Sequence, residues 1–136
     1  MSIMTRWYDN QQTILYTDYG EVWSWRDVHK HGNTTITPIL SEAKQPVARI
    51  VDLSYTIWHT SGIFVDNFKQ SIARYHEMPV DVAIAIVHNE GIRTAMKTIV
   101  NQHGAPHRIY AFPMNIDDAL TIIHDYRKTN KAGIRS

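Results

Sequence analysis

Residues 47–62, VARIVDLSYTIWHTSG, decide the fold of this chain, because they pass from a strand through a loop into a helix. Residues 47–53 form an almost continuous apolar run, which predicts a strand that is covered on both faces of its sheet. Asp52 interrupts this run just before its end. The segment HTSG at 59–62 then opens a predicted helix that extends to His76.

The start of this helix offers two interpretations. Thr60, Ser61 and Gly62 place two hydroxyl groups and a glycine beside backbone N–H groups that have no partner within the helix. Such a position can hold an anion or carry a phosphate group. It can equally be an ordinary N-cap, and the local sequence alone favours the cap, because Ser and Thr are among the commonest residues there.

Apolar runs alternate with amphipathic segments along the rest of the chain. The predicted strands are 5–9, 13–19, 47–53, 80–87 and 108–112, and the predicted helices are 24–43, 61–76, 90–102 and 116–126. We expect the helix at 24–43 to be kinked or broken, because Gly32 and Pro38 interrupt its pattern. The first two strands predict an antiparallel hairpin, and strands that alternate with helices predict parallel pairing through right-handed crossovers.

The predicted fold class is therefore α/β, with a single mixed sheet in which a hairpin precedes repeated strand–helix units. The chain has 136 residues, which suits one domain, and we place that domain at 1–127. Residues 128–136 are rich in Lys and Arg and show no packing pattern. We expect them to form a frayed basic tail.

The composition argues against several classes of function. The formal net charge is +1 and the charges are spread along the chain, so binding to nucleic acid is not expected. No run approaches the ~20 apolar residues of a membrane span, and no membrane association is expected. The absence of cysteine excludes disulfides, thiolate catalysis and cysteine metal sites. These features are typical of a cytoplasmic protein.

No motif in the chain supplies a catalytic or metal-binding set. The eight histidines do not form a ligand pattern such as HExxH, and there is neither a GxSxG elbow nor a phosphate-binding glycine loop. His59 and Ser61 stand too close in sequence for a good nucleophile–base pair. Asp52 could act as a lone acid, although an aspartate at a strand end more often binds backbone N–H groups. We therefore predict a protein that is not an enzyme and that uses no metal or cofactor.

The four tryptophans are more informative. Trp7 and Trp25 fit a core. Trp23 and Trp58, together with Tyr55, fall where loops are predicted, and exposed aromatic side chains often anchor a partner or a ligand. The alternative is that they cover the ends of the sheet, and the sequence leaves both interpretations open.

The order of elements and the segment LSYTIWHTSG resemble the STAS domain of bacterial anti-sigma-factor antagonists. In that family, a strand leads into an Asp-Ser-Ser-Gly pattern at the start of the second helix, and a partner kinase phosphorylates the first Ser. The resemblance covers roughly residues 5–126 and implies that Thr60 is the phosphoacceptor position, with Ser61 beside it. His59 stands where the family has Asp.

A second branch of the same fold is also similar to this chain, namely the STAS-like proteins related to CRAL-TRIO lipid carriers. That branch shares a WxW-like opening, a Trp before the second helix and a short aromatic strand before the last helix. The matching features here are Trp23-Ser24-Trp25, Trp58 and the segment IYAF at 109–112. Some members of the branch are thought to hold apolar ligands.

The two resemblances lead to two expectations. The first is a non-enzymatic bacterial regulatory module that binds a protein partner, such as an anti-sigma factor or kinase, through a phosphorylation-sensitive loop. Its predicted switch and partner-binding residues are Ser54, Tyr55, Trp58, His59 and Gly62, with Thr60 and Ser61 as phosphoacceptor candidates. The alternative is a carrier or sensor of a small apolar ligand. The exposure of Thr60 and Trp58 separates them. A regulator needs Thr60 exposed, with Trp58 and Tyr55 in an open patch, whereas a carrier needs these aromatic residues in the wall of a closed cavity of roughly 300 Å³ or more.

Overall fold

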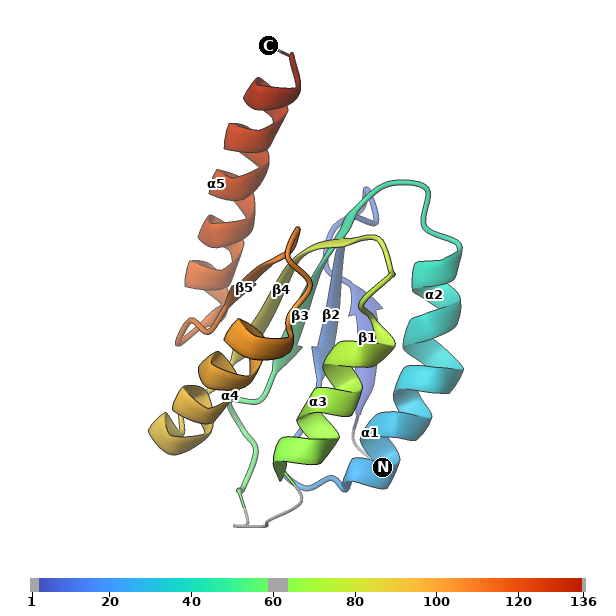
Figure 1. Cartoon of the computed structure of the whole chain (residues 1–136). Helices are drawn as coiled ribbons and strands as arrows, with labels where there is room; N and C mark the ends of the chain where they lie inside the picture. The colour runs from blue at the N-terminus through green and yellow to red at the C-terminus, as the bar shows by residue number, and fades with distance from the viewer. Residues whose placement is uncertain (1–2, 59–63, 136) are drawn as a thin grey trace.

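A single five-stranded sheet forms the centre of the molecule (Figure 1). The computed structural model describes residues 3–58 and 64–135. The strands are β1 (Met4–Trp7), β2 (Ile14–Asp18), β3 (Val47–Asp52), β4 (Val80–Ile86) and β5 (Ile109–Ala111), and they lie in that order across the sheet. β1 pairs antiparallel with β2, and all the other neighbours are parallel. The predicted α/β class, the hairpin and the central position of β3 are confirmed.

The helices cover both faces of this sheet. They are α1 (Trp25–His31), the π-helical segment η1 (Gly32–Ile36), α2 (Thr37–Ser41), α3 (Phe64–Arg74), α4 (Glu90–His103) and α5 (Ile116–Arg135). Figure 1 shows α5 on one face and the remaining helices on the other. α4 begins after Asn89, whose side chain caps the helix by accepting a hydrogen bond from the backbone N–H of Ile92.

The helix predicted at 24–43 to be kinked or broken is not broken: it runs without interruption from Trp25 to Ser41, and its irregularity is a π-helical turn. Ser24 and Asp27 form a capping box at the start of α1. In η1 the backbone N–H of Thr37 donates to the carbonyl of Gly32. A Cβ atom at position 32 would lie 2.6 Å from Nη1 of Arg74 and 2.7 Å from the Tyr75 hydroxyl, so the ends of these two side chains would have to move to admit any residue other than glycine.

The C-terminal helix differs from the prediction. α5 continues to Arg135, past residue 127 where we expected a frayed tail to begin. At Arg127 the helix is held to the rest of the domain by contacts that the hydrophobic pattern does not reveal. Arg127 donates hydrogen bonds to the carbonyl oxygen of Thr13 at 2.7 Å and to its hydroxyl at 2.8 Å, and lies 3.7 Å from the Asp81 carboxylate. Residues 128–135 contain no proline and several good helix formers, so the helix continues beyond this anchor.

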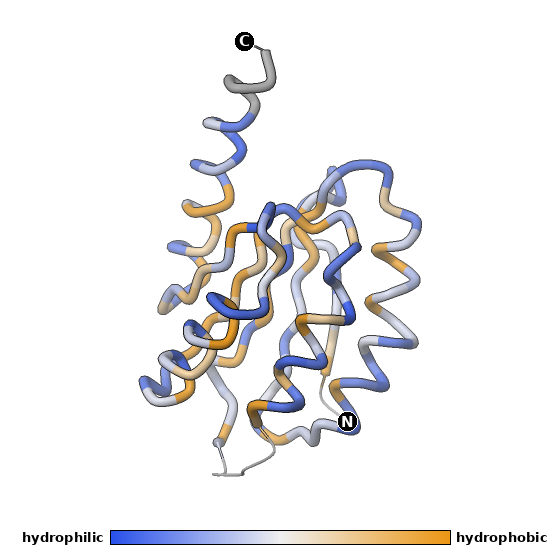
Figure 2. Tube along the Cα trace, viewed as in Figure 1, coloured by the Kyte–Doolittle hydropathy of each residue, from blue (hydrophilic) through white to orange (hydrophobic). Residues whose placement is uncertain are grey.

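The two faces of the sheet carry separate cores. The core beneath α5 is formed by Ala48, Ile50, Val82, Ile84, Ile86, Ala119 and Ile123. On the other face, one cluster lies around Leu53, Phe64 and Met96 and a second around Leu15 and Leu40. Figure 2 shows apolar residues along the strands and polar residues on the outer surfaces of the helices. Among the described residues, no helix combines the length and apolar character that crossing a membrane requires.

Candidate functional site

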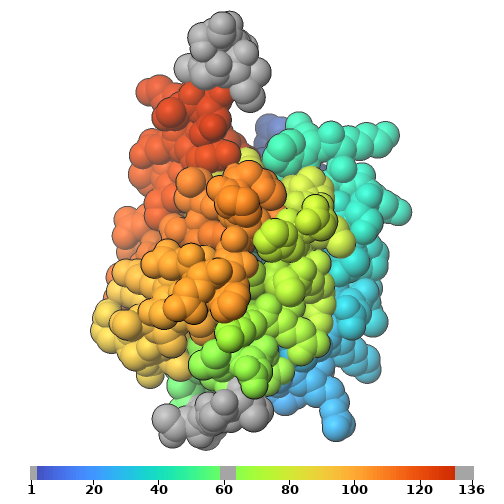
Figure 3. Space-filling view, viewed as in Figure 1, coloured from blue at the N-terminus to red at the C-terminus, as the bar shows by residue number. Residues whose placement is uncertain are grey.

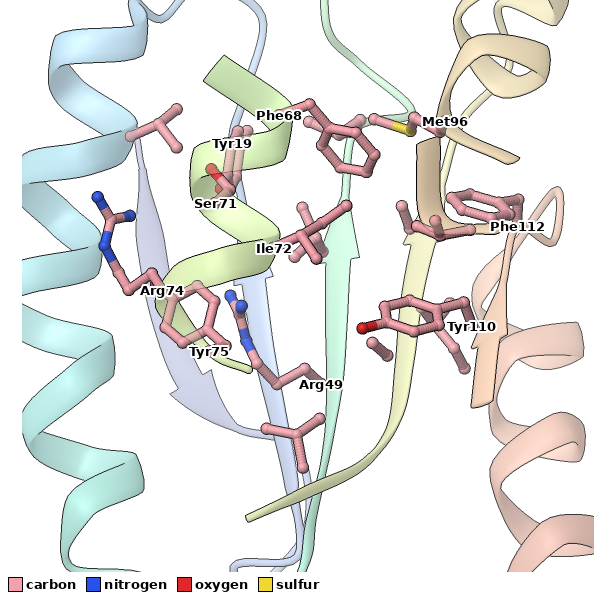
Figure 4. A pocket seen from close by; sticks show the side chains of 18 of the residues that line it. Tyr19, Arg49, Phe68, Ser71, Ile72, Arg74, Tyr75, Met96, Tyr110 and Phe112 are labelled. Atoms are coloured by element: carbon pink, nitrogen blue, oxygen red, sulfur yellow. The ribbon is translucent and has the colours of Figure 1, made fainter. Parts of the chain in front are cut away.

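A cavity of about 110 Å³ lies between the sheet and the helices α1, α3 and α4. Its walls are mostly apolar and rich in rings, and the aromatic residues include Tyr19, Trp23, Trp25, Trp58, Phe68 and Phe112. Figure 4 shows several of these side chains in the layer between α3 and the strands. From outside, the helices hide the strands on this side of the molecule (Figure 3). A cavity of this kind can hold a small apolar molecule.

Two alanines on β4 form part of the cavity wall. β4 has a strand on each side, yet its residues alternate between buried and half-buried. Val82, Ile84 and Ile86 are buried. Ala83 and Ala85 are half-buried and line the cavity. Ala85 packs against the cluster around Phe64 and Met96, and Ala83 against the cluster around Leu15 and Leu40, so a larger side chain at either position would enter the cavity or displace these neighbours.

Trp23 is the centre of an aromatic cluster at the carboxyl end of the strands. Its ring lies 5.2 Å from Tyr19, 5.1 Å from Trp25 and 5.7 Å from Trp58, in each case edge to face. This is the arrangement that aromatic pairs favour. Its indole N–H also donates to the Thr56 hydroxyl at 3.0 Å. The cluster therefore fixes Trp58 in the cavity wall.

Arg49 places a buried positive charge in this mostly apolar wall. The residue is only 8% exposed, and no described group accepts a hydrogen bond from its Nε atom. Its guanidinium carbon lies 4.6 Å from the centre of the Tyr75 ring, and that of Arg74 lies 5.9 Å from the same ring. Ser71, on the α3 side of the cavity, also has a buried hydroxyl without a described partner. Figure 4 shows Arg49 extending from β3 toward Tyr75.

Arg108 also lines the cavity but has a different environment. It is 7% exposed, and its guanidinium donates to the carbonyl oxygens of Val80 at 2.8 Å, Tyr75 at 2.9 Å and Met78 at 3.0 Å. These hydrogen bonds tie the segment between α3 and β4 to the start of β5. Arg108 therefore has a structural role, whereas the Nε–H group of Arg49 has no hydrogen-bond acceptor among the described residues.

The charge of Arg49 acts on groups nearby. Burial first, and then the positive charge of Arg49, lower the pKa of His31. His31 Nε2 lies 2.7 Å from the hydroxyl of Thr5, which in turn lies 2.9 Å from the buried hydroxyl of Thr17. Burial raises the pKa of Tyr19 to about 12, although Arg49 opposes this shift. Among the described residues, no Asp or Glu lines the cavity to balance these arginines.

Asp52, the candidate acid, faces away from the cavity. Alternate residues of β3 point to opposite faces, so Asp52 shares the α5 face with Ala48 and Ile50, while Arg49 lies on the cavity face. The Asp52 carboxylate accepts hydrogen bonds from the Tyr16 hydroxyl at 2.5 Å, and from the Ser54 backbone N–H at 3.0 Å and hydroxyl at 2.6 Å. Asp52 thus binds the loop that follows β3.

The structure separates the predicted loop residues from one another. Ser54 is held by Asp52, Tyr55 is 66% exposed, and Trp58 lines the cavity. His59, Thr60, Ser61 and Gly62 lie outside the described residues. The prediction that Thr60 or Ser61 accepts a phosphate therefore stays a prediction.

Histidines in the described part of the chain make no metal centre. No group of three or more His, Asp or Glu side chains there could hold a metal ion. His29 instead connects α1 to α3, because Nη2 of Arg74 lies 3.0 Å from its Nδ1 and Asn67 Oδ1 lies 2.8 Å from its Nε2. An arginine only donates, so Nδ1 accepts and Nε2 carries the proton.

Comparison with models of protein families, with curated proteins and with solved structures finds no match for this chain. The site must therefore be interpreted from its own chemistry.

Sequence reasoning found the tryptophans of the site but missed its polar residues. Arg49 lies inside the run VARIVD, and its apolar neighbours led to the prediction of a buried strand without a functional role for Arg49. The signal was nevertheless present, because an arginine in a strand that is covered on both faces needs a partner. Arg74 and Ser71 lie on an ordinary amphipathic helix and gave no such signal.

Proposed function

We propose that this chain is a non-enzymatic, STAS-like binding module that holds a small, mainly apolar ligand in the cavity beneath α3. The observation that carries this proposal is the aromatic cavity, into whose wall Trp58 is packed. Of the two functions that the resemblances imply, the ligand carrier or sensor is the one that needs Trp58 in this position.

The size of the cavity limits the ligand. Drug-sized ligands occupy pockets of roughly 300 Å³ or more, whereas this cavity measures about 110 Å³. A dry apolar cavity of about 150 Å³ accommodates benzene. The proposed ligand therefore has a body of about the size of one aromatic ring or a short alkyl chain.

The proposal includes no catalytic step. A hydrolytic or acid–base mechanism needs a base or nucleophile beside the ligand. The carboxylate of Asp52 faces the opposite side of the sheet and is engaged by Tyr16 and Ser54. The polar groups that do face the cavity, on Arg49 and Ser71, are suited to binding.

Filling the cavity tests this proposal directly. We expect Ala85→Leu to weaken the binding of toluene, a neutral probe of suitable size, at least tenfold, because the larger side chain occupies the space that the probe needs. Binding is measured by isothermal titration and by shifts of the tryptophan indole N–H signals in NMR spectra. Ala83→Leu, on the same wall, should act in the same direction.

The matched control is Ala73→Leu, which makes the same substitution at an exposed position of α3. It should leave toluene binding unchanged. Failure of the unaltered protein to bind any ring-sized probe, neutral or charged, would contradict the proposed function.

A second candidate is the protein-interaction module, and exposed apolar side chains beside the predicted switch loop favour it. Tyr55 is 66% exposed, Ile57 55% and Val22 68%. A hydrogen bond of 2.9 Å from the Ile57 backbone N–H to the Glu21 carbonyl brings the two segments together. Neighbouring exposed apolar residues of this kind are typical of protein-binding surfaces.

Phosphorylation of Thr60 is the distinguishing feature of this second candidate. Thr60→Glu is expected to leave the melting temperature nearly unchanged, because a negative charge close to a helix N-terminus is favourable. Ser136→Glu serves as a control for added charge. Mass spectrometry of the protein isolated from its own cells should find phosphate on Thr60, and unfolding of the Thr60→Glu variant would contradict the switch.

A further inference from the structure

We propose that the ligand of this cavity is a small monocarboxylate with an apolar body, and that the guanidinium of Arg49 binds its carboxylate. This inference rests on the proposed function and names the chemical class of the ligand. Benzoate and hexanoate are representatives of the class.

Arg49 lacks the acceptors that usually surround a buried guanidinium. A buried guanidinium normally has an acid or several carbonyl oxygens around it, and Arg108 in the same wall shows what such an environment looks like. Arg49 is buried to a similar degree, but its Nε–H group has no hydrogen-bond acceptor among the described residues, and its guanidinium lies over the Tyr75 ring. A cation over a ring recovers only part of the lost hydration. An anion in the cavity would supply the missing acceptor.

The shape of the Arg49 guanidinium suits a carboxylate. Arginine presents its N–H groups as a planar fork that matches the two oxygens of a carboxylate. Figure 4 shows the Arg49 side chain extending through the layer beneath α3 that also contains Ile72 and Tyr75. Ser71 adds a buried hydroxyl without a described partner on the α3 side.

The charge and the volume of the rest of the site favour a ligand with a single negative charge. Arg49 and Arg74 lie on either side of one tyrosine, and the described lining contains no acid. A neutral ligand would leave this charge uncompensated, and a dianion would bring a second charge against apolar walls. A single carboxylate on a ring-sized apolar body satisfies both the charge and the volume of about 110 Å³.

The experiment compares benzoate with toluene in the unaltered protein and in Arg49→Met. We expect Arg49→Met to bind benzoate at least tenfold more weakly and to bind toluene about as well as the unaltered protein. The variant should remain folded, because methionine occupies similar space and removes a buried charge that has no acid beside it. Its melting temperature in the absence of ligand should equal or exceed that of the unaltered protein.

A spectroscopic measurement separates charge pairing from a change of shape. The His31 ring experiences the positive charge of Arg49. Neutralising that charge, by bound benzoate or by Arg49→Met, should raise the pKa of His31 measured by NMR, whereas toluene should not. Arg6→Met is the matched control, because Arg6 also lies over a tyrosine ring, 5.0 Å from the centre of Tyr16, but does not line the cavity. It should leave benzoate binding unchanged.

The outcomes distinguish the two proposals. Toluene binding without benzoate binding, or benzoate binding that Arg49→Met does not weaken, would overturn the carboxylate assignment and leave the apolar cavity standing. Binding of neither probe would overturn both. Benzoate binding that is lost in Arg49→Met and in Ala85→Leu, but kept in Arg6→Met, would support both.

Discussion

Replacement of Arg108 by methionine is expected to lower the free energy of unfolding by about 3–5 kcal/mol, because several buried carbonyl oxygens lose a charged donor at once. The guanidinium binds the carbonyls of Val80, Tyr75 and Met78 at 3.0 Å or less, and that of His76 at 3.4 Å. These oxygens belong to the segment that leads from α3 into β4. Urea unfolding followed by tryptophan fluorescence measures the effect.

Two controls define the Arg108 result. Arg26→Met removes an arginine from an exposed position of α1 and should change stability by less than about 0.5 kcal/mol. Arg108→Lys should be intermediate, since an ammonium group cannot span the positions that the planar fork reaches. A loss below about 1 kcal/mol for Arg108→Met would show that water or neighbouring groups satisfy the carbonyls equally well.

Replacement of Asp52 by alanine is expected to destabilise the domain by about 2–4 kcal/mol. The Asp52 carboxylate joins β2 to β3 through Tyr16 and fixes the start of the following loop through Ser54. A double-mutant cycle with Tyr16→Phe isolates the contribution of the Tyr16–Asp52 hydrogen bond, and we expect a coupling energy of about 1–2 kcal/mol. Additive effects of the two substitutions would contradict a direct interaction.

The same pair predicts how stability depends on alkaline pH. Burial first, and then the Asp52 carboxylate, raise the pKa of Tyr16 above its ordinary value of 10.0. The folded state therefore retains a proton that the unfolded state releases. The contribution of Tyr16 is complete below pH 10 and decreases as the pH rises above that value. In Asp52→Ala the pKa of Tyr16, followed by its absorbance, should move back toward 10.

The sequence was sufficient for the fold because its apolar periods are distinct. The apolar runs at 47–53 and 80–87 identified two inner strands, and the amphipathic segment at 90–102 identified α4. The irregular helix was predicted from Gly32 and Pro38, but not its π-helical form. The turn begins at Gly32, which lies against the ends of the Arg74 and Tyr75 side chains. Such a contact joins positions more than 40 residues apart and has no local signature.

The site was less accessible to sequence reasoning for a related reason. Trp23 and Trp58 were candidates for ligand or partner binding because they are aromatic residues in predicted loops. In the structure the centres of their rings lie 5.7 Å apart. The cavity is lined in part by Ala83 and Ala85, and small residues in a buried strand look the same in the sequence whether or not they line a cavity. Likewise, only the positions of all the neighbouring side chains show that the Nε–H group of Arg49 has no hydrogen-bond acceptor among the described residues.

The π-helical turn accommodates one extra residue in the helix that connects β2 to β3. An α-helix advances by 100° per residue. Val28 and Leu40, buried on the two sides of the turn, would be about 120° apart on a regular helix of the same length, and the π-helical turn lets both face the sheet. Deletion of one residue from Gly32–Ile36 would let the turn close as an ordinary α-helix and would leave these two side chains about 20° apart. A one-codon deletion here would accordingly be tolerated better than one in the regular helix α4, where it would rotate everything after it by about 100°.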